Sequence, residues 1–152
     1  MRNTLIDDPS PYLQQHKNNP VHWQTWNKDS LNQAKIQKKP ILLSVGYSSC
    51  HWCHVMAHES FEDQKTADIM NEFFINIKVD REERPDLDFI LQSSFQLFNQ
   101  TGGGWPLTMF LDENGVPFMG GTYFPKEAKN GLPSFKEVLQ KVAGAYKDQR
   151  EK

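Results

Sequence analysis

Residues 41–56 read ILLSVGYSSCHWCHVM, and the fold prediction starts from this stretch. Its first seven residues form a short apolar run, which is typical of a buried strand. Cys50 and Cys53 follow at a point where a serine, Ser48 or Ser49, can cap a helix. Apolar residues then recur for about twenty residues, which predicts a helix that bends near SFEDQ (60–64). The Cys pair is therefore predicted at a junction between a strand and a helix.

This location has a chemical consequence for the two thiols. Unpaired N–H groups and the helix dipole at a helix N-terminus stabilise a thiolate. Cys50 comes first, so we expect it to be the more exposed sulfur and the nucleophile. Cys53 follows one helical turn later and is close enough to resolve a mixed disulfide.

The remaining patterns predict an α/β protein with a central mixed sheet flanked by helices. The strands are expected at 41–47, 73–80, 107–112 and 116–124, and further helices at 29–39, where Asp29 is the expected N-cap, 84–100 and 134–152. The first two strands are joined through a helix and should be parallel, whereas the last two form a hairpin and should be antiparallel. TGGGWP (101–106) is expected to be a turn.

Residues 1–28 are rich in Pro, Asn and Gln and are predicted to be an irregular extension packed on a domain at 29–152. We expect the aromatic residues of this extension, Tyr12, Trp23 and Trp26, to cover apolar surface of the domain rather than to bind a ligand.

Composition excludes several classes of protein. The chain has 152 residues, 38% hydrophobic and 24% charged, which is ordinary for a globular protein. Its net charge of −2 gives no basic surface for nucleic acid or for a membrane. No apolar run approaches the roughly 20 residues that span a bilayer, and the N-terminus lacks the apolar region of a secretory signal. We therefore expect a cytoplasmic location, with no nucleic-acid partner, no membrane partner and no cofactor.

The element order resembles that of the thioredoxin fold. In that fold a strand leads into C-x-x-C and a long helix, and a later proline opens a strand beside the Cys pair. Pro106, in the step Trp105–Pro106, matches that proline. The resemblance implies a cis peptide bond there and a loop whose backbone binds an extended substrate, with Trp105, Pro106, His51 and Trp52 as substrate-binding residues.

Five sequence blocks give a finer resemblance. They are similar to the thioredoxin-like family that includes bacterial YyaL and the spermatogenesis-associated thioredoxin-like proteins, and they read SPYLQQHKNNPVHW (10–23), GYSSCHWCHVMAHESF (46–61), VDREERPDLD (79–88), GGGWPLTMFLD (102–112) and GGTYFP (120–125). The resemblance implies a thiol–disulfide oxidoreductase, with a protein or small-molecule disulfide or dithiol as substrate. In that family a larger α-helical toroid, similar to sugar-processing enzymes, commonly follows the domain. The alternative hypothesis is therefore a non-catalytic accessory or binding module of a larger, carbohydrate-related protein.

The Cys motif also departs from ordinary thioredoxins. His51 and Trp52 replace their Gly-Pro pair, and Ser44 replaces a buried Asp that accepts the proton of the resolving thiol. Candidates for proton transfer in its place are His54, Glu59 and Asp80. A protonated His51 would stabilise the Cys50 thiolate and make the disulfide more oxidising.

Three other readings of SSCHWCH (48–54) stay open at this point. CHWCH fits haem attachment with His54 as the axial ligand, although the strand pattern argues against it. Cys50, Cys53, His54 and His58 are zinc-ligand types, but on one continuous helix they cannot enclose a metal tetrahedrally. The cysteines can also be inert core residues. We expect no metal.

Overall fold

A four-stranded mixed sheet forms the centre of the protein. The computed structural model describes residues 2–99, 103–129 and 131–151. The strands are β1 (Ile41–Gly46), β2 (Ile75–Asp80), β3 (Leu107–Leu111) and β4 (Pro117–Gly121), in the order β2-β1-β3-β4. β1 and β2 are parallel, and β3 is antiparallel to both β1 and β4, so the predicted strand directions are confirmed.

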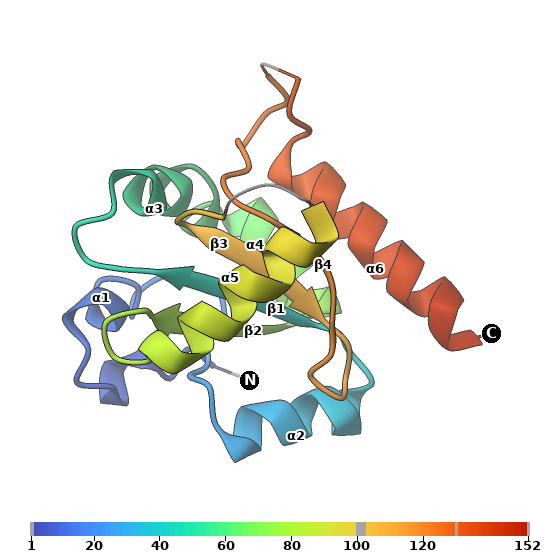
Figure 1. Ribbon diagram of the computed structural model, residues 1–152, viewed down its shortest axis with the longest axis horizontal. Coiled ribbons are helices and arrows are strands. Elements are labelled where there is room, and N and C mark those ends of the chain that lie inside the picture. Colours follow the sequence, from blue (N-terminus) through green and yellow to red (C-terminus); the bar gives the residue numbers. More distant parts are fainter. Residues whose placement is uncertain (1, 100–102, 130, 152) are drawn as a thin grey trace.

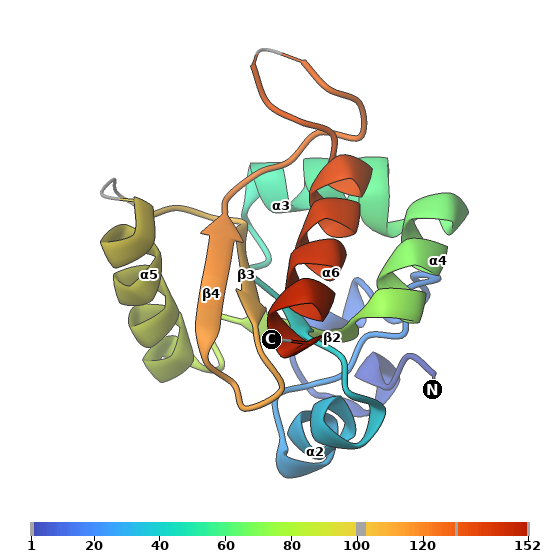
Figure 2. The same ribbon diagram turned by 90° about the vertical axis from the view of Figure 1, so that its right-hand side faces the viewer.

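Helices cover both faces of this sheet. Figure 2 shows α5 on one side and α4 and α6 on the other. The helical elements are η1 (Leu5–Asp7), α1 (Pro11–Gln14), α2 (Lys28–Gln37), α3 (His51–Met56), the π-helical turn η2 (Ala57–Phe61), α4 (Gln64–Phe73), α5 (Pro85–Asn99) and α6 (Phe135–Glu151). The turn predicted over 101–106 lies partly outside the described residues.

Local hydrogen bonds explain where two of the helices begin. α2 starts at Lys28 because the Asn27 side chain accepts from the Ser30 N–H at 2.8 Å while the Ser30 hydroxyl accepts from the Asn27 N–H at 3.2 Å. The prediction of Asp29 as this cap was wrong. The bend predicted near residues 60–64 is confirmed: η2, which continues α3, ends at Phe61, and Asp63 caps α4 by accepting from the Thr66 N–H at 3.0 Å.

The N-terminal segment is more regular than predicted, since it contains η1 and α1. It follows the outer edge of β2, where the Gln24 N–H donates to the Asn76 carbonyl at 2.8 Å and the Gln24 carbonyl accepts from the Lys78 N–H at 2.9 Å. In Figure 1 this blue segment lies on the β2 side of the sheet, and α6 lies on the opposite side of the molecule. Tyr12 and Trp23 are fully buried, as their predicted packing role requires.

The two faces of the sheet differ in chemistry. Side chains alternate along β2, so Ile75, Ile77 and Val79 enter an apolar core that includes α5. The other face carries a row of buried polar side chains: Ser44, Asn76, Lys78, Asp80 and Thr108. An alternating strand commonly exposes its polar face to water. Here the N-terminal segment covers that face together with α4 and α6, and all six residues of β2 are buried.

Gly46, the last residue of β1, is in close contact with Tyr12 and Cys53, which pack on the sheet. A Cβ atom at this position would lie closer than 3.0 Å to both the Tyr12 hydroxyl and Cys53 Sγ. We expect Gly46→Ala to lower the free energy of unfolding by about 1–3 kcal/mol through overpacking, measured by urea denaturation.

Gly144 in α6 is the matched control, because a Cβ atom there meets nothing within 4 Å. Gly144→Ala should raise stability by about 0.5–1 kcal/mol, since alanine favours a helix interior. An unchanged stability of Gly46→Ala would contradict the close approach.

Candidate active site

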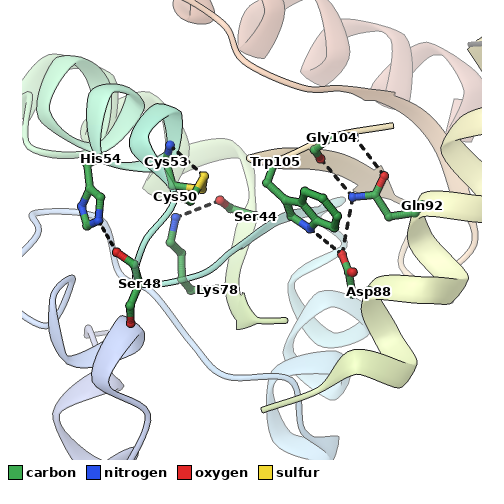
Figure 3. Close-up of a disulfide and its surroundings, with 10 residues drawn as sticks. All are labelled: Ser44, Ser48, Cys50, Cys53, His54, Lys78, Asp88, Gln92, Gly104 and Trp105. Carbon is green, nitrogen blue, oxygen red and sulfur yellow. Dashed lines mark hydrogen bonds between the residues drawn. A yellow bond between two sulfur atoms is a disulfide. The ribbon is translucent and has the colours of Figure 1, made fainter. Parts of the chain in front are cut away.

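Cys50 and Cys53 form a disulfide at the start of α3 (Figure 3). Their Cα atoms are 5.3 Å apart, within the usual range for a disulfide. Cys50 itself is the N-cap of α3, because its Sγ accepts from the Cys53 N–H at 3.2 Å. The serine cap predicted at Ser48 or Ser49 was therefore wrong. Both cysteines are nearly covered, with 4% of Cys50 and 1% of Cys53 exposed.

The two residues between the cysteines point outward. His51 and Trp52 are exposed, and the ring centroids of Trp52 and Tyr123 lie 5.1 Å apart. Trp52 lines a hollow of about 330 Å³ beside the Cys pair, together with Phe95, Gly103, Gly104, Trp105, Thr122 and Tyr123. Two of the four predicted substrate-binding residues, Trp52 and Trp105, thus line one surface depression.

The Trp105–Pro106 peptide bond is cis, as the resemblance implied. Its loop is held by side chains from α5 (Figure 3): the Trp105 indole N–H donates to Asp88 at 2.9 Å, and the Gln92 side chain bonds both the N–H and the carbonyl of Gly104, at 3.1 and 2.9 Å. The Arg81 guanidinium lies 4.3 Å from the Trp105 ring centroid. These contacts fix the loop that carries Pro106.

These anchoring residues were not among the residues predicted from the sequence. Asp88 is buried, although a run of charged residues such as DREERPDLD is usually solvated. A signal was available, because Asp88 and Gln92 are spaced i, i+4 and therefore share one face of α5 with apolar neighbours.

The three candidates for proton transfer have other partners. The His54 imidazole, through Nε2, donates to the Ser48 carbonyl at 2.6 Å. Glu59 accepts from the Tyr123 hydroxyl, and Asp80 accepts from the Ser10 hydroxyl at 2.7 Å. Within residues 2–99, 103–129 and 131–151, none of the three has a hydrogen bond to either sulfur.

Tyr123, which follows β4, contacts Trp52 of α3 and donates a hydrogen bond to Glu59 of η2. Partial burial and the neighbouring Glu59 carboxylate raise the pKa of Tyr123 to about 12. At neutral pH its hydroxyl is therefore protonated and serves as the donor to Glu59.

The family assignment rests on nearly the whole chain. A family model described as "Protein of unknown function, DUF255" (Thioredox_DsbH) matches residues 2–152. The chain belongs to the Thioredox_DsbH family. This confirms the family resemblance found in the five sequence blocks.

This Thioredox_DsbH chain is similar to longer proteins. The Caenorhabditis elegans protein described as uncharacterized protein B0495.5 is 47% identical over 150 residues, covering 99% of this chain and 20% of that protein. Spermatogenesis-associated protein 20 of Rattus norvegicus is 45% identical over 148 residues, covering 97% of this chain and 19% of that protein. The chain thus spans about a fifth of the length of these relatives.

Solved structures similar to this Thioredox_DsbH chain establish its fold. One described as "DsbH Oxidoreductase" has a TM-score of 0.59 and 19% identity, covering 84% of this chain and 85% of that one. A thioredoxin from Thermus thermophilus has a TM-score of 0.56 and 13% identity, covering 81% of this chain and 87% of that one. The chain has a thioredoxin fold, as predicted.

His58, one of the zinc-ligand types in the motif, pairs with Glu62 at 2.9 Å. In the described part of the chain, no three His, Cys, Asp or Glu side chains come together in a way that could hold a metal. None of the helices described is both long and apolar enough to cross a membrane.

Lys78 is buried below the Cys pair, next to Ser44, the residue that replaces the buried Asp of ordinary thioredoxins. Its Nζ donates to the Ser44 hydroxyl at 2.8 Å, and only 1% of the residue is exposed. The rings of Phe61, Trp23 and Tyr12 surround Nζ, with centroids at 4.3, 4.9 and 5.4 Å. Ring faces attract a cation, but they replace only part of the hydration lost on burial. Burial therefore lowers the pKa of Lys78 well below its ordinary value of 10.5.

This shift makes stability depend on pH in the alkaline range. Between the lowered pKa of Lys78 in the folded protein and 10.5 in the unfolded chain, the unfolded chain binds more protons. The free energy of unfolding therefore rises with pH across that window. Lys78→Met removes this titration, so the stability of the variant should rise less between about pH 7 and about pH 10.

The measurement is urea unfolding of both proteins at the two pH values. Lys65→Met, at an exposed position of α4, is the control and should keep the wild-type pH dependence. Parallel pH profiles of wild type and Lys78→Met would show that the pKa of Lys78 is not lowered.

Proposed function

We propose that the chain is a thiol–disulfide oxidoreductase of the thioredoxin type, with Cys50 as the nucleophile and Cys53 as the resolving cysteine. The observation that carries the proposal is the Cys50–Cys53 disulfide at the N-terminus of α3, beside the loop of the cis Trp105–Pro106 bond. The oxidoreductase named among the structures of similar fold supports the same reaction class.

The chemistry is a pair of exchange steps. The reduced Cys50 thiolate attacks one sulfur of a substrate disulfide, and the other substrate sulfur leaves as a thiolate. The Cys53 thiolate then attacks Cys50 Sγ, closes the Cys50–Cys53 disulfide and releases the second substrate thiolate. Two electrons pass to the substrate in total.

The backbone at the start of α3 favours the first step. The Cys53 N–H already points at Cys50 Sγ, with a distance of 3.2 Å. A hydrogen bond from a backbone N–H is stronger when the acceptor is charged. This contact therefore stabilises the thiolate form of Cys50 more than it stabilises the disulfide.

The hollow between Trp52 and Trp105 is the proposed binding surface for the substrate. Its aromatic walls offer apolar contact, and Pro106 lies in the loop that would present its backbone to an extended chain. We propose a protein or small-molecule disulfide as substrate, with His51 at the rim. In the predicted cytoplasmic location the surrounding thiols would keep the couple reduced and able to donate electrons.

Reduction of insulin disulfides, with dithiothreitol as the electron source, tests the proposal. Cys50→Ser should reduce the rate to that of dithiothreitol alone, because serine cannot form the mixed disulfide. Ser49→Ala changes an exposed neighbour and should keep the wild-type rate.

The resolving role of Cys53 has a separate readout. Cys53→Ser should accumulate a covalent complex between Cys50 and a substrate peptide, visible by mass spectrometry. Equal insulin-reduction rates for wild type and Cys50→Ser would overturn the assignment.

A second candidate function is a docking module within a longer protein. α5 exposes large apolar side chains, with 73% of Phe89, 58% of Ile90 and 80% of Leu97 accessible. Relatives about five times as long as this chain supply further residues that could cover this face. Hydrogen exchange distinguishes the two proposals: amides of α5 protected only in the longer protein would favour docking. Both functions can coexist.

A further inference from the structure

The Tyr12 hydroxyl is a buried polar group without a partner. Tyr12 is fully buried, and its hydroxyl has no hydrogen bond among the described residues. Burial raises the pKa of Tyr12 above its usual range, and the negative charge of Asp80 adds to the shift. The hydroxyl therefore keeps its proton and is a donor without an acceptor, which costs free energy in the folded state.

This hydroxyl lies next to the sulfur of the resolving cysteine. A Cβ atom built on Gly46 would come closer than 3.0 Å to the Tyr12 hydroxyl on one side and to Cys53 Sγ on the other. The absence of a side chain at Gly46 thus leaves the hydroxyl and the sulfur as neighbours across one small gap.

Two other polar groups near Tyr12 are already engaged. Asp80 accepts from the Ser10 hydroxyl at 2.7 Å and from the Glu82 N–H at 2.9 Å. Ser44 accepts from Lys78 at 2.8 Å. The His16 ring meets the Tyr12 ring edge-on, with centroids 4.9 Å apart; its Nδ1 faces Asn19, and its Nε2 has no partner among the described residues. Cys53 Sγ is the neighbour whose capacity to accept changes with oxidation state.

Reduction changes that sulfur from a poor acceptor into a good one. A dithiol reductant gives two electrons and two protons, its own two thiols become one disulfide, and the Cys50–Cys53 bond breaks to give two thiols. A sulfur held in a disulfide or in a neutral thiol accepts hydrogen bonds weakly, whereas a thiolate is a charged acceptor. Reduction frees Cys53 Sγ to lose its proton, so the orphan donor gains a charged acceptor only in the reduced protein.

We propose that the Tyr12 hydroxyl donates a hydrogen bond to Cys53 Sγ once the disulfide is reduced, and that this bond stabilises the reduced form. The N-terminal segment then contributes directly to the redox site, through a residue more than thirty positions before the Cys pair. The inference rests on the proposed thiol–disulfide function, but it concerns the equilibrium of the couple rather than turnover of a substrate.

The test is Tyr12→Phe, which keeps the ring and removes only the hydroxyl. In equilibrium with a dithiothreitol redox buffer, the oxidised form of the variant should be favoured about fivefold more than in wild type, the effect of one hydrogen bond. Urea unfolding should show an oxidised variant at least as stable as oxidised wild type, and a reduced variant less stable than reduced wild type. A purely structural role of the hydroxyl would change both forms alike.

Tyr146→Phe is the matched control. The Tyr146 hydroxyl donates to Glu113 at 2.9 Å, on the part of α6 far from the Cys pair. Its loss should alter both redox forms equally and leave the equilibrium with dithiothreitol unchanged.

The outcomes separate this inference from the proposed function. An unchanged redox equilibrium in Tyr12→Phe, with wild type active on insulin, would overturn the role of Tyr12 alone. A fivefold shift in a protein without insulin reduction would support Tyr12 and count against the oxidoreductase. A disulfide that dithiothreitol leaves intact in the folded protein would overturn the role of Tyr12 as well.

Discussion

The burial of Lys78 is the constraint on which the region around the Cys pair depends. Moving an ammonium or amine group from water into the core costs its hydration free energy. A hydrogen-bond partner and surrounding aromatic rings must offset that cost. Ser44 supplies the partner, and the rings of Tyr12, Trp23 and Phe61 supply the cover. Two of those rings come from the N-terminal segment, so the segment completes the fold.

The same cover creates the surroundings of the sulfur atoms. Tyr12 packs over Lys78 and brings its hydroxyl to Cys53, while Gly46 leaves the space that both groups need. On the other side of the disulfide, α5 holds the loop of Pro106 through Asp88 and Gln92. The disulfide thus lies between a buried polar layer and an anchored loop, and its first helical turn is capped by Cys50 itself.

Much of the fold was predictable because it depends on local pattern. The apolar run before Cys50 formed β1, the strand directions followed from the connections, and the bend after η2 fell where polar residues interrupt the helix. The cap at Asn27 was missed because two capping patterns overlap there, and side-chain geometry chose between them. The short helix α1 in the N-terminal segment was not predicted because it depends on tertiary contacts more than on its own helix propensity.

The sequence alone determined where Cys50, Cys53 and Pro106 lie on the fold, because each occupies a set position in the strand–helix–strand order. Only the tertiary structure decided which groups surround these residues. Tyr12, Lys78 and Asp88 come from three distant segments. Nothing in the local sequence of Tyr12 or Lys78 distinguishes them from ordinary surface or core residues, and Asp88 offered only its i, i+4 spacing with Gln92. The three side chains have their roles because folding buries them and brings their segments close together, and neither effect exists before the chain is packed.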